Sequence, residues 1–68
     1  MKITLGEAFP IEQARVREIL GYYKEIGPAG AFGALMIEQV LQRADKAVVE
    51  QDIVAMTRVY KEMLEIES

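Results

Sequence analysis

The stretch EIGPAGAFGALMIEQVL, residues 25–41, decides how this chain folds. It has a glycine at every third position from Gly27 to Gly33, a proline, and then an apolar run with helical spacing. Glycine is favoured just after the end of a helix, and proline is favoured in the first turn of one. Gly27 followed by Pro28 therefore ends one helix and starts another, and the stretch predicts a helical hairpin.

Three explanations are open for the glycines of this stretch. A phosphate-binding loop needs a lysine and a hydroxyl after its last glycine, and alanine, leucine and methionine follow Gly33 instead. A hinge would let the first helix swing or swap between chains. We favour the third explanation, in which Gly27, Gly30 and Gly33 allow close packing of the second helix against another backbone.

Working outward from the stretch, we expect a single domain over residues 1–68. An arm at 1–9 precedes three helices at about 10–26, 28–50 and 52–66. Pro10 suits the first turn of the first helix, and Asp52 is a good N-cap for the third. Within the arm, Ile3 and Leu5 indicate an extended segment, and Thr4-x-x-Glu7 is alternatively a capping box. On the third helix, Arg58 with Glu62 and Lys61 with Glu65 are predicted ion pairs.

The second helix carries an apolar arc of roughly 200°, wider than the outer helix of a bundle needs. The residues of this arc are Ala29, Phe32, Gly33, Met36, Ile37, Val40, Leu41, Ala44, Ala47 and Val48. The sequence therefore predicts an all-α three-helix bundle with a long central second helix and a short N-terminal arm. We expect that helix to pack against both others, or against one of them and a partner chain.

Composition excludes several classes of protein. The 68 residues contain no cysteine and no histidine, so disulfides are impossible, and we expect no zinc or iron site and no cofactor. The net charge of −3 comes without a basic stripe, so we expect no nucleic-acid partner. The uncharged run 26–37, about 12 residues, is too short to span a membrane. The first residues do not resemble a signal sequence, and we expect a cytoplasmic protein.

The side chains that enzymes use are nearly absent. Asparagine and tryptophan are missing as well, and Ser68 is the only serine. Thr4 and Thr57 have no obvious base beside them, so we predict that the chain is not an enzyme. A carboxylate site for Mg²⁺ or Ca²⁺, from Glu62 and Glu65 or from the acids of the 45–52 region, remains an alternative to simple solvation of these groups.

Six residues are candidates for an interface with another protein. Some are amphipathic aromatics, which are enriched at binding hot spots, and the others lie outside or at the edge of the apolar faces. These residues are Tyr22, Tyr23, Leu35, Arg43, Val49 and Val54. Leu35 and Val49 share the Glu38/Gln42 side of the second helix. For Arg43 we also expect a structural role, with its stem on the core and its head paired to Glu18 or Glu62.

Residues 26–67 contain a G-x-x-G-x-F-G start, followed by an A-x-x-A pair and a D-x-x-x-M-x-x-x-Y run. On these residues the chain resembles small uncharacterised prophage-encoded proteins of Gram-negative bacteria. The resemblance implies an accessory protein of a phage-derived locus and assigns no activity to any residue. The same region also looks like one hairpin of a tetratricopeptide-type repeat, but a single hairpin makes no solenoid.

From these patterns we expect a non-enzymatic module for protein–protein interaction or self-assembly, most simply a homodimer. The alternative is an acidic regulator or inhibitor that binds a host or phage protein through its carboxylates. The first expectation depends on the wide apolar arc, because a chain of this size can bury only about 60% of its unfolded surface.

Overall fold

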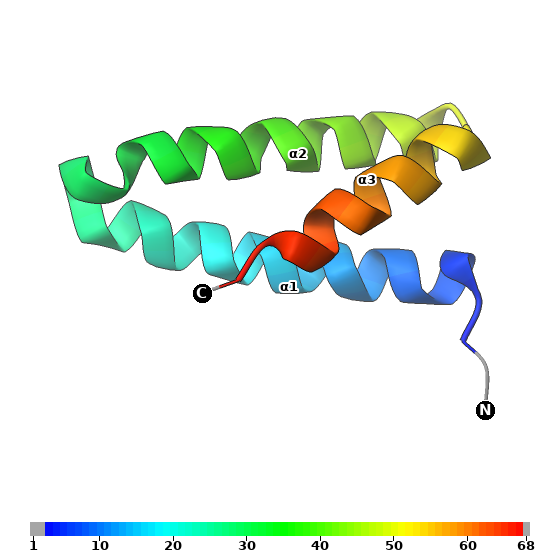
Figure 1. The fold of residues 1–68 in the computed structure, drawn as a ribbon, viewed down its shortest axis with the longest axis horizontal. Coiled ribbons are helices and arrows are strands. Elements are labelled where there is room, and N and C mark those ends of the chain that lie inside the picture. The colour runs from blue at the N-terminus through cyan, green and yellow to red at the C-terminus, as the bar shows by residue number, and fades with distance from the viewer. Residues whose placement is uncertain (1–2, 68) are drawn as a thin grey trace.

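The computed structural model describes residues 3–67, and its regular structure is helical. The helices are α1 (Leu5–Ile26), α2 (Ala31–Val49) and α3 (Ile53–Glu65), and the 3-10 turn η1 (Gly27–Gly30) joins α1 to α2. α1 and α2 run antiparallel as a hairpin, and α3 crosses one face of this hairpin diagonally (Figure 1). Residues 3–67 contain no strand, and the prediction of an all-α fold is confirmed.

The first helix begins earlier than predicted, so the expected arm at 1–9 is wrong from Leu5 onward; residues 1 and 2 lie outside the described part of the chain. Thr4 caps the helix, since its Oγ1 accepts from the Glu7 N–H at 3.2 Å and donates to the Glu7 carboxylate at 2.9 Å. Pro10 thus lies inside the helix, where it removes one backbone hydrogen bond. The adjacent Phe9 is 1% exposed, and its burial compensates for that loss.

A 3-10 turn joins α1 to α2, so the second helix does not start at residue 28 as predicted. Gly27 ends α1 with a φ of 82°, in the left-handed region that favours glycine, and its N–H donates to the Lys24 carbonyl. η1 follows, so α2 starts at Ala31 and has 19 residues against the 22 of α1. The predicted long second helix is therefore wrong. Residues 28–30, which were predicted to begin this helix, belong to the 3-10 turn instead.

Gly30 in η1 and Gly33 in α2 both lie close against Tyr23 of α1. A Cβ atom on Gly30 would lie 2.2 Å from the backbone oxygen of Tyr23, and one on Gly33 would lie 2.5 Å from the Tyr23 ring. Nothing lies within 4 Å of a Cβ on Gly27, so that glycine serves the backbone conformation rather than close packing. Two glycines of the opening stretch thus make room for one residue of α1.

The second joint is short and locally capped. Asp52 caps α3 by accepting from the Ala55 N–H at 3.0 Å, as its sequence position predicts. At this joint α2 ends at Val49, one residue before the predicted end at 50, and α3 begins at Ile53, one residue after the predicted start at 52. The far end of α3 is at Glu65, one residue before the predicted end at 66. Gln51 turns the chain with a φ of 54°.

The core lies between the hairpin and α3, and every helix contributes to it. Its buried residues are Phe9, Val16, Ile19, Ile37, Leu41, Ala44, Val59 and Met63. The Cα atoms span 37 × 27 × 15 Å, and the short dimension fits two layers of helices, with α1 and α2 in one layer and α3 in the other. Each helix packs against both others, so α2 contacts α1 and α3, which is one of the two arrangements expected for it.

A partly buried ion pair fixes the end of α3 on α1. At the C-terminal end of α3, Arg15 donates to the carbonyl oxygens of Met63 at 2.7 Å and Ile66 at 2.8 Å, and the Met63 oxygen also accepts the Ile66 N–H at 3.1 Å. Glu12, 8% exposed, holds the same guanidinium through two hydrogen bonds of 2.8 and 2.7 Å. The hydrogen bond to Glu12 raises the pKa of Arg15. This network ties the C-terminal end of α3 to α1.

Candidate functional site

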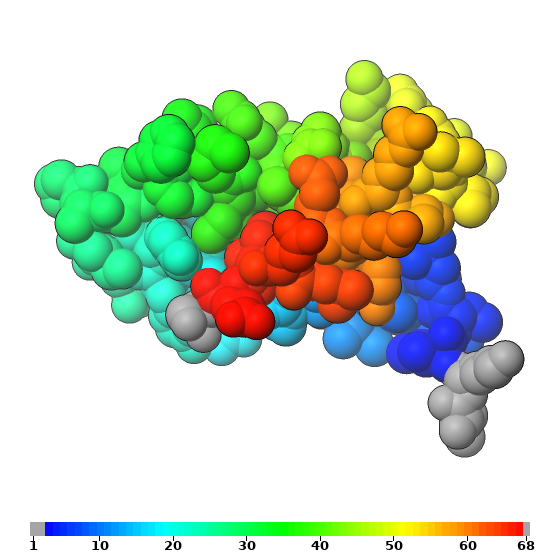
Figure 2. Space-filling model, viewed as in Figure 1, coloured from blue at the N-terminus to red at the C-terminus, as the bar shows by residue number. Residues whose placement is uncertain are grey.

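The α1–α2 end of the hairpin exposes large apolar side chains because α3 stops before reaching it. At 1.5 Å per residue α1 is about 33 Å long and α3 about 20 Å, and α3 crosses diagonally, so it covers only part of the hairpin face. Figures 1 and 2 show the chain after α3 lying near the middle of the hairpin, with the α1–α2 joint free beyond it. We call the exposed side chains on this end the tip patch: Tyr22, Ile26, Phe32 and Met36.

Part of the predicted core belongs to this surface. Phe32 is 75% exposed and Met36 48%, and Val48 at the other end of α2 is 43% exposed. All three were predicted in the buried arc, and this assignment is wrong. A third helix as long as the hairpin would have reached the end of α2 that carries Met36, whereas Val48 lies at the end where α3 begins and Phe32 lies in line with the exposed Leu35 and Gln39. The shortness of the 52–66 segment relative to its neighbours was the signal that could have identified this uncovered end.

The two adjacent tyrosines of α1 point in different directions. Tyr22 is 48% exposed, and its hydroxyl donates to the Glu18 carboxylate at 2.8 Å, which raises the pKa of Tyr22. Tyr23 is half-buried, with its ring against Gly33. Tyr23 also lines a shallow hollow together with Met36 and Ile66, where the end of the chain meets the hairpin. Tyr22 therefore belongs to the surface and Tyr23 to the packing beneath it.

The outer side of α2 carries Leu35 and Val49, which are 51% and 82% exposed. They share this side with Phe32 and with polar residues, and it lies opposite the buried Ala34, Ile37, Leu41 and Ala44. α2 forms one long edge of the molecule, with no helix beyond it (Figure 1). We call the exposed residues spaced three and four apart along this edge the α2 stripe: Phe32, Leu35, Gln39, Gln42, Lys46 and Val49.

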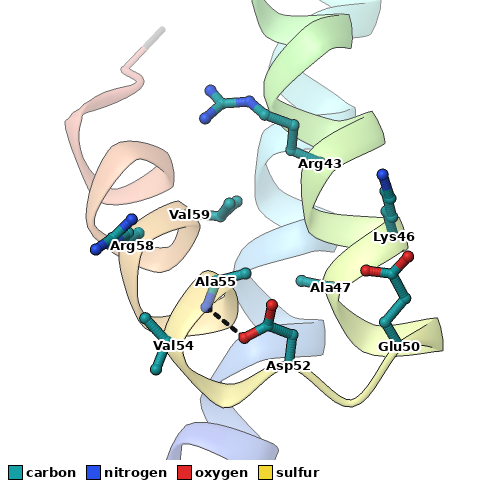
Figure 3. A pocket seen from close by; sticks show the side chains of 9 residues that line it. All are labelled: Arg43, Lys46, Ala47, Glu50, Asp52, Val54, Ala55, Arg58 and Val59. Atoms are coloured by element: carbon teal, nitrogen blue, oxygen red, sulfur yellow. Dashed lines mark hydrogen bonds between the residues drawn. The ribbon is translucent and has the colours of Figure 1, made fainter.

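Arg43 and Val54 lie elsewhere, at a groove between α2 and α3. The groove has a volume of ≈ 410 Å³, and Figure 3 shows it open between the two helices. Its lining is mixed, with an apolar floor, three cations and two acids: Arg43, Lys46, Ala47, Glu50, Asp52, Val54, Ala55, Arg58 and Val59. Val54 is 63% exposed at the rim. The structure thus places five of the six candidate residues at the tip, on the α2 stripe and at this groove, and it places Tyr23 in the packing beneath the tip.

Arg43 forms a bidentate pair with Glu62, at 2.8 and 2.6 Å, and this is one of the two partners expected from the sequence. The hydrogen bond to Arg43 lowers the pKa of Glu62, and the same bond raises the pKa of Arg43. Since Glu62 is held by α2, the predicted pair of Arg58 with Glu62 does not form; among residues 3–67 neither Arg58 nor Lys61 makes an ion pair.

The carboxylates considered for a metal are dispersed. Glu62 is bound to Arg43, and Asp45 is bound to Arg17 at 2.7 Å. Within the described chain no three or more acidic side chains are arranged to hold a metal ion. None of the helices formed by residues 3–67 is both long and apolar enough to cross a membrane. Comparisons with protein-family models, with curated proteins and with solved structures find no match to this chain.

Proposed function

We propose that this protein is a non-catalytic module that works by self-association, and that a second copy covers the outer side of α2. The observation that carries the proposal is the exposure of Phe32, Leu35 and Val49, at 75%, 51% and 82%, along one side of a helix whose opposite side packs into the core. Phe32 and Leu35 lie at one end of this side and Val49 at the other, with polar residues between them. Exposed apolar side chains that lie together on one side favour an interface, whereas scattered ones are ordinary.

The charges around the α2 stripe favour contact with another protein surface. Three charged side chains beside it are already paired within the chain: Glu38 with Lys24 at 2.9 Å, Asp45 with Arg17 and Arg43 with Glu62. A second chain that approaches this edge therefore meets few charges that need new partners. The resemblance of residues 26–67 to prophage-encoded proteins fits an accessory role of this kind.

The same pairing argues against the alternative of an acidic regulator. Four acids, Glu12, Glu38, Asp45 and Glu62, are bound to cations of their own chain. The α2–α3 groove, which is the largest hollow described, contains more cations than acids in its lining. A surface that imitates nucleic acid or attracts a basic partner would need its carboxylates free.

Sedimentation velocity from about 1 μM to about 1 mM, the range in which weak complexes dissociate, tests self-association. We expect the mass to rise from that of one chain to that of two. Leu35→Ser should weaken the dimer about 30-fold, since half a leucine side chain is worth about 1 kcal/mol and the dimer buries it twice.

The matched control is Ile11→Ser, which removes a side chain that is 62% exposed and lies on α1, outside the α2 stripe. This variant should dimerise like the unmodified protein. A single-chain mass at every concentration, or equal weakening by Ile11→Ser and Leu35→Ser, would refute the proposal.

A further inference from the structure

The spacing of the α2 stripe is the same when read from either end, and its second positions differ, with Leu35 at one end and Lys46 at the other. The spacings between its residues are three, four, three, four and three, the heptad spacing of helices that pack side by side. Its two ends are apolar, Phe32 and Val49, and its two central residues are both glutamine, Gln39 and Gln42. The point midway between Val40 and Leu41 is the centre of this arrangement.

We propose that two copies pair through α2 in antiparallel orientation, with a two-fold axis at that midpoint. This inference rests on the proposed self-association and gives its geometry. Phe32 of each copy then packs against Val49 of the other, and Gln39 faces Gln42. Leu35 is covered by the aliphatic stem of Lys46 from the second copy. A two-fold contact of this kind is closed, so association stops at the dimer.

Charge favours the antiparallel over the parallel pairing. In a parallel pair, Lys46 would face its own copy across the interface, and two ammonium groups would be brought together. In the antiparallel pair the two Lys46 ammonium groups lie apart, and each comes within one helical turn of Glu38 from the second copy, a carboxylate that also binds Lys24 of its own chain. Among residues 3–67 Lys46 makes no ion pair within its own chain, so its charge is free to do so. The amides of Gln39 and Gln42 can both donate and accept, so they satisfy each other at the centre.

The flanks of the stripe contribute little for or against the pairing. Across one flank, Glu38 of each copy approaches Asp45 of the other, and across the other flank Arg43 approaches its own copy. These like charges are offset within each chain, because Glu38 and Asp45 each bind a cation and Arg43 binds a carboxylate. The contact is a strip about 28 Å long and one helix wide, smaller than the ~800 Å² per partner of a standard interface. The dimer is therefore weak and exchanges its subunits.

A spin-label distance distinguishes the two orientations. The chain contains no cysteine, so Glu50→Cys, at the exposed end of α2, gives a single labelling site that leaves the α2 stripe intact. In the antiparallel pair, residue 50 of one chain lies beside residue 31 of the other. The two labels are therefore separated by the axial rise of 19 residues, which gives a distance of roughly 30 Å between them. In a parallel pair they lie at one level, about one helix diameter apart. A distance in the shorter range overturns the inference.

Cysteine cross-linking tests the register independently. We expect an equimolar mixture of Gln39→Cys and Gln42→Cys chains to form a disulfide-linked dimer at least fivefold faster than either variant alone, because only the mixed pair shares a level across the interface. Equal rates for all three samples overturn the register. A chain that stays monomeric in sedimentation refutes the proposed function together with this geometry, whereas a dimer with the wrong distances refutes the geometry alone.

Discussion

Adding one methyl group at Gly30 tests the geometry of the hairpin. The Cβ of an alanine would lie 2.2 Å from the Tyr23 backbone oxygen, and real Cβ contacts essentially never fall below 3.0 Å, so the two backbones must separate by about 0.8 Å. Gly30 has φ −95° and ψ −3°, which alanine also adopts, so the cost is steric rather than conformational. Overpacking of this kind costs about 1–3 kcal/mol.

Gly21 provides the matched control. It lies in the interior of α1, and nothing lies within 4 Å of a Cβ built there. Gly21→Ala should therefore stabilise the protein by about 0.5–1 kcal/mol, since alanine is the better helix former. The same chemical change is thus expected to have opposite signs at two positions nine residues apart.

The assay is thermal and urea unfolding of both variants, followed by circular dichroism at a concentration where the protein is monomeric. A change of 1 kcal/mol shifts the Tm of a domain of this size by about 4–8 °C, so the Tm of Gly30→Ala should fall below that of Gly21→Ala by at least about 6 °C. Gly33→Ala should be milder than Gly30→Ala, because its obstacle is a side-chain ring that can rotate away. Equal stability of Gly30→Ala and Gly21→Ala would refute the close approach of α1 and η1.

Three further predictions concern the bonds that hold the helices. Arg15→Met should lower the free energy of unfolding, measured in urea, by roughly 2 kcal/mol, because Glu12 loses its cation and the end of α3 loses a hydrogen-bond donor. A decrease of less than about 0.5 kcal/mol would contradict this prediction. Thr4→Ala should cost about 1 kcal/mol through loss of the α1 cap, and unchanged stability would contradict that cap. Arg43→Gln should cost at most about 1 kcal/mol near pH 7, since the pair with Glu62 is half-exposed. Arg43 lowers the pKa of Glu62 in the folded state, so the pair stabilises the protein fully above the pKa that Glu62 has in the unfolded chain. This stabilisation is lost as the pH falls through the folded-state pKa of Glu62. The free energies of unfolding of the unmodified protein and of Arg43→Gln should therefore converge in acid.

The candidate site was only partly predictable from the sequence. Leu35 and Val49 were identified because they interrupt the apolar pattern of their helix, and they are exposed. Phe32 and Met36 follow that pattern and were therefore assigned to the core, although they form part of the surface. Periodicity gives the direction in which a side chain points, but it does not give the length of the helix that would cover it.

The choice of ionic partners was also beyond the sequence. Glu62 is four residues from Arg58 and was expected to pair with it, but it binds Arg43 from α2 instead. Ion pairs four residues apart on an exposed helix are worth only a few tenths of a kcal/mol, so a bidentate partner from a neighbouring helix displaces them. Which partner is present depends on how α3 crosses the hairpin.

The sequence by itself determined the features that arise within a few residues: the end of α1 at Gly27, the cap of α3 at Asp52, and the helical class of the whole chain. These depend on backbone conformations and hydrogen bonds between near neighbours, which residue types specify directly. Only the tertiary structure decided where α3 ends on the hairpin, through Arg15, and which apolar side chains stay exposed. Burial depends on contacts between segments distant in the chain, and no local pattern encodes how far one helix extends over another.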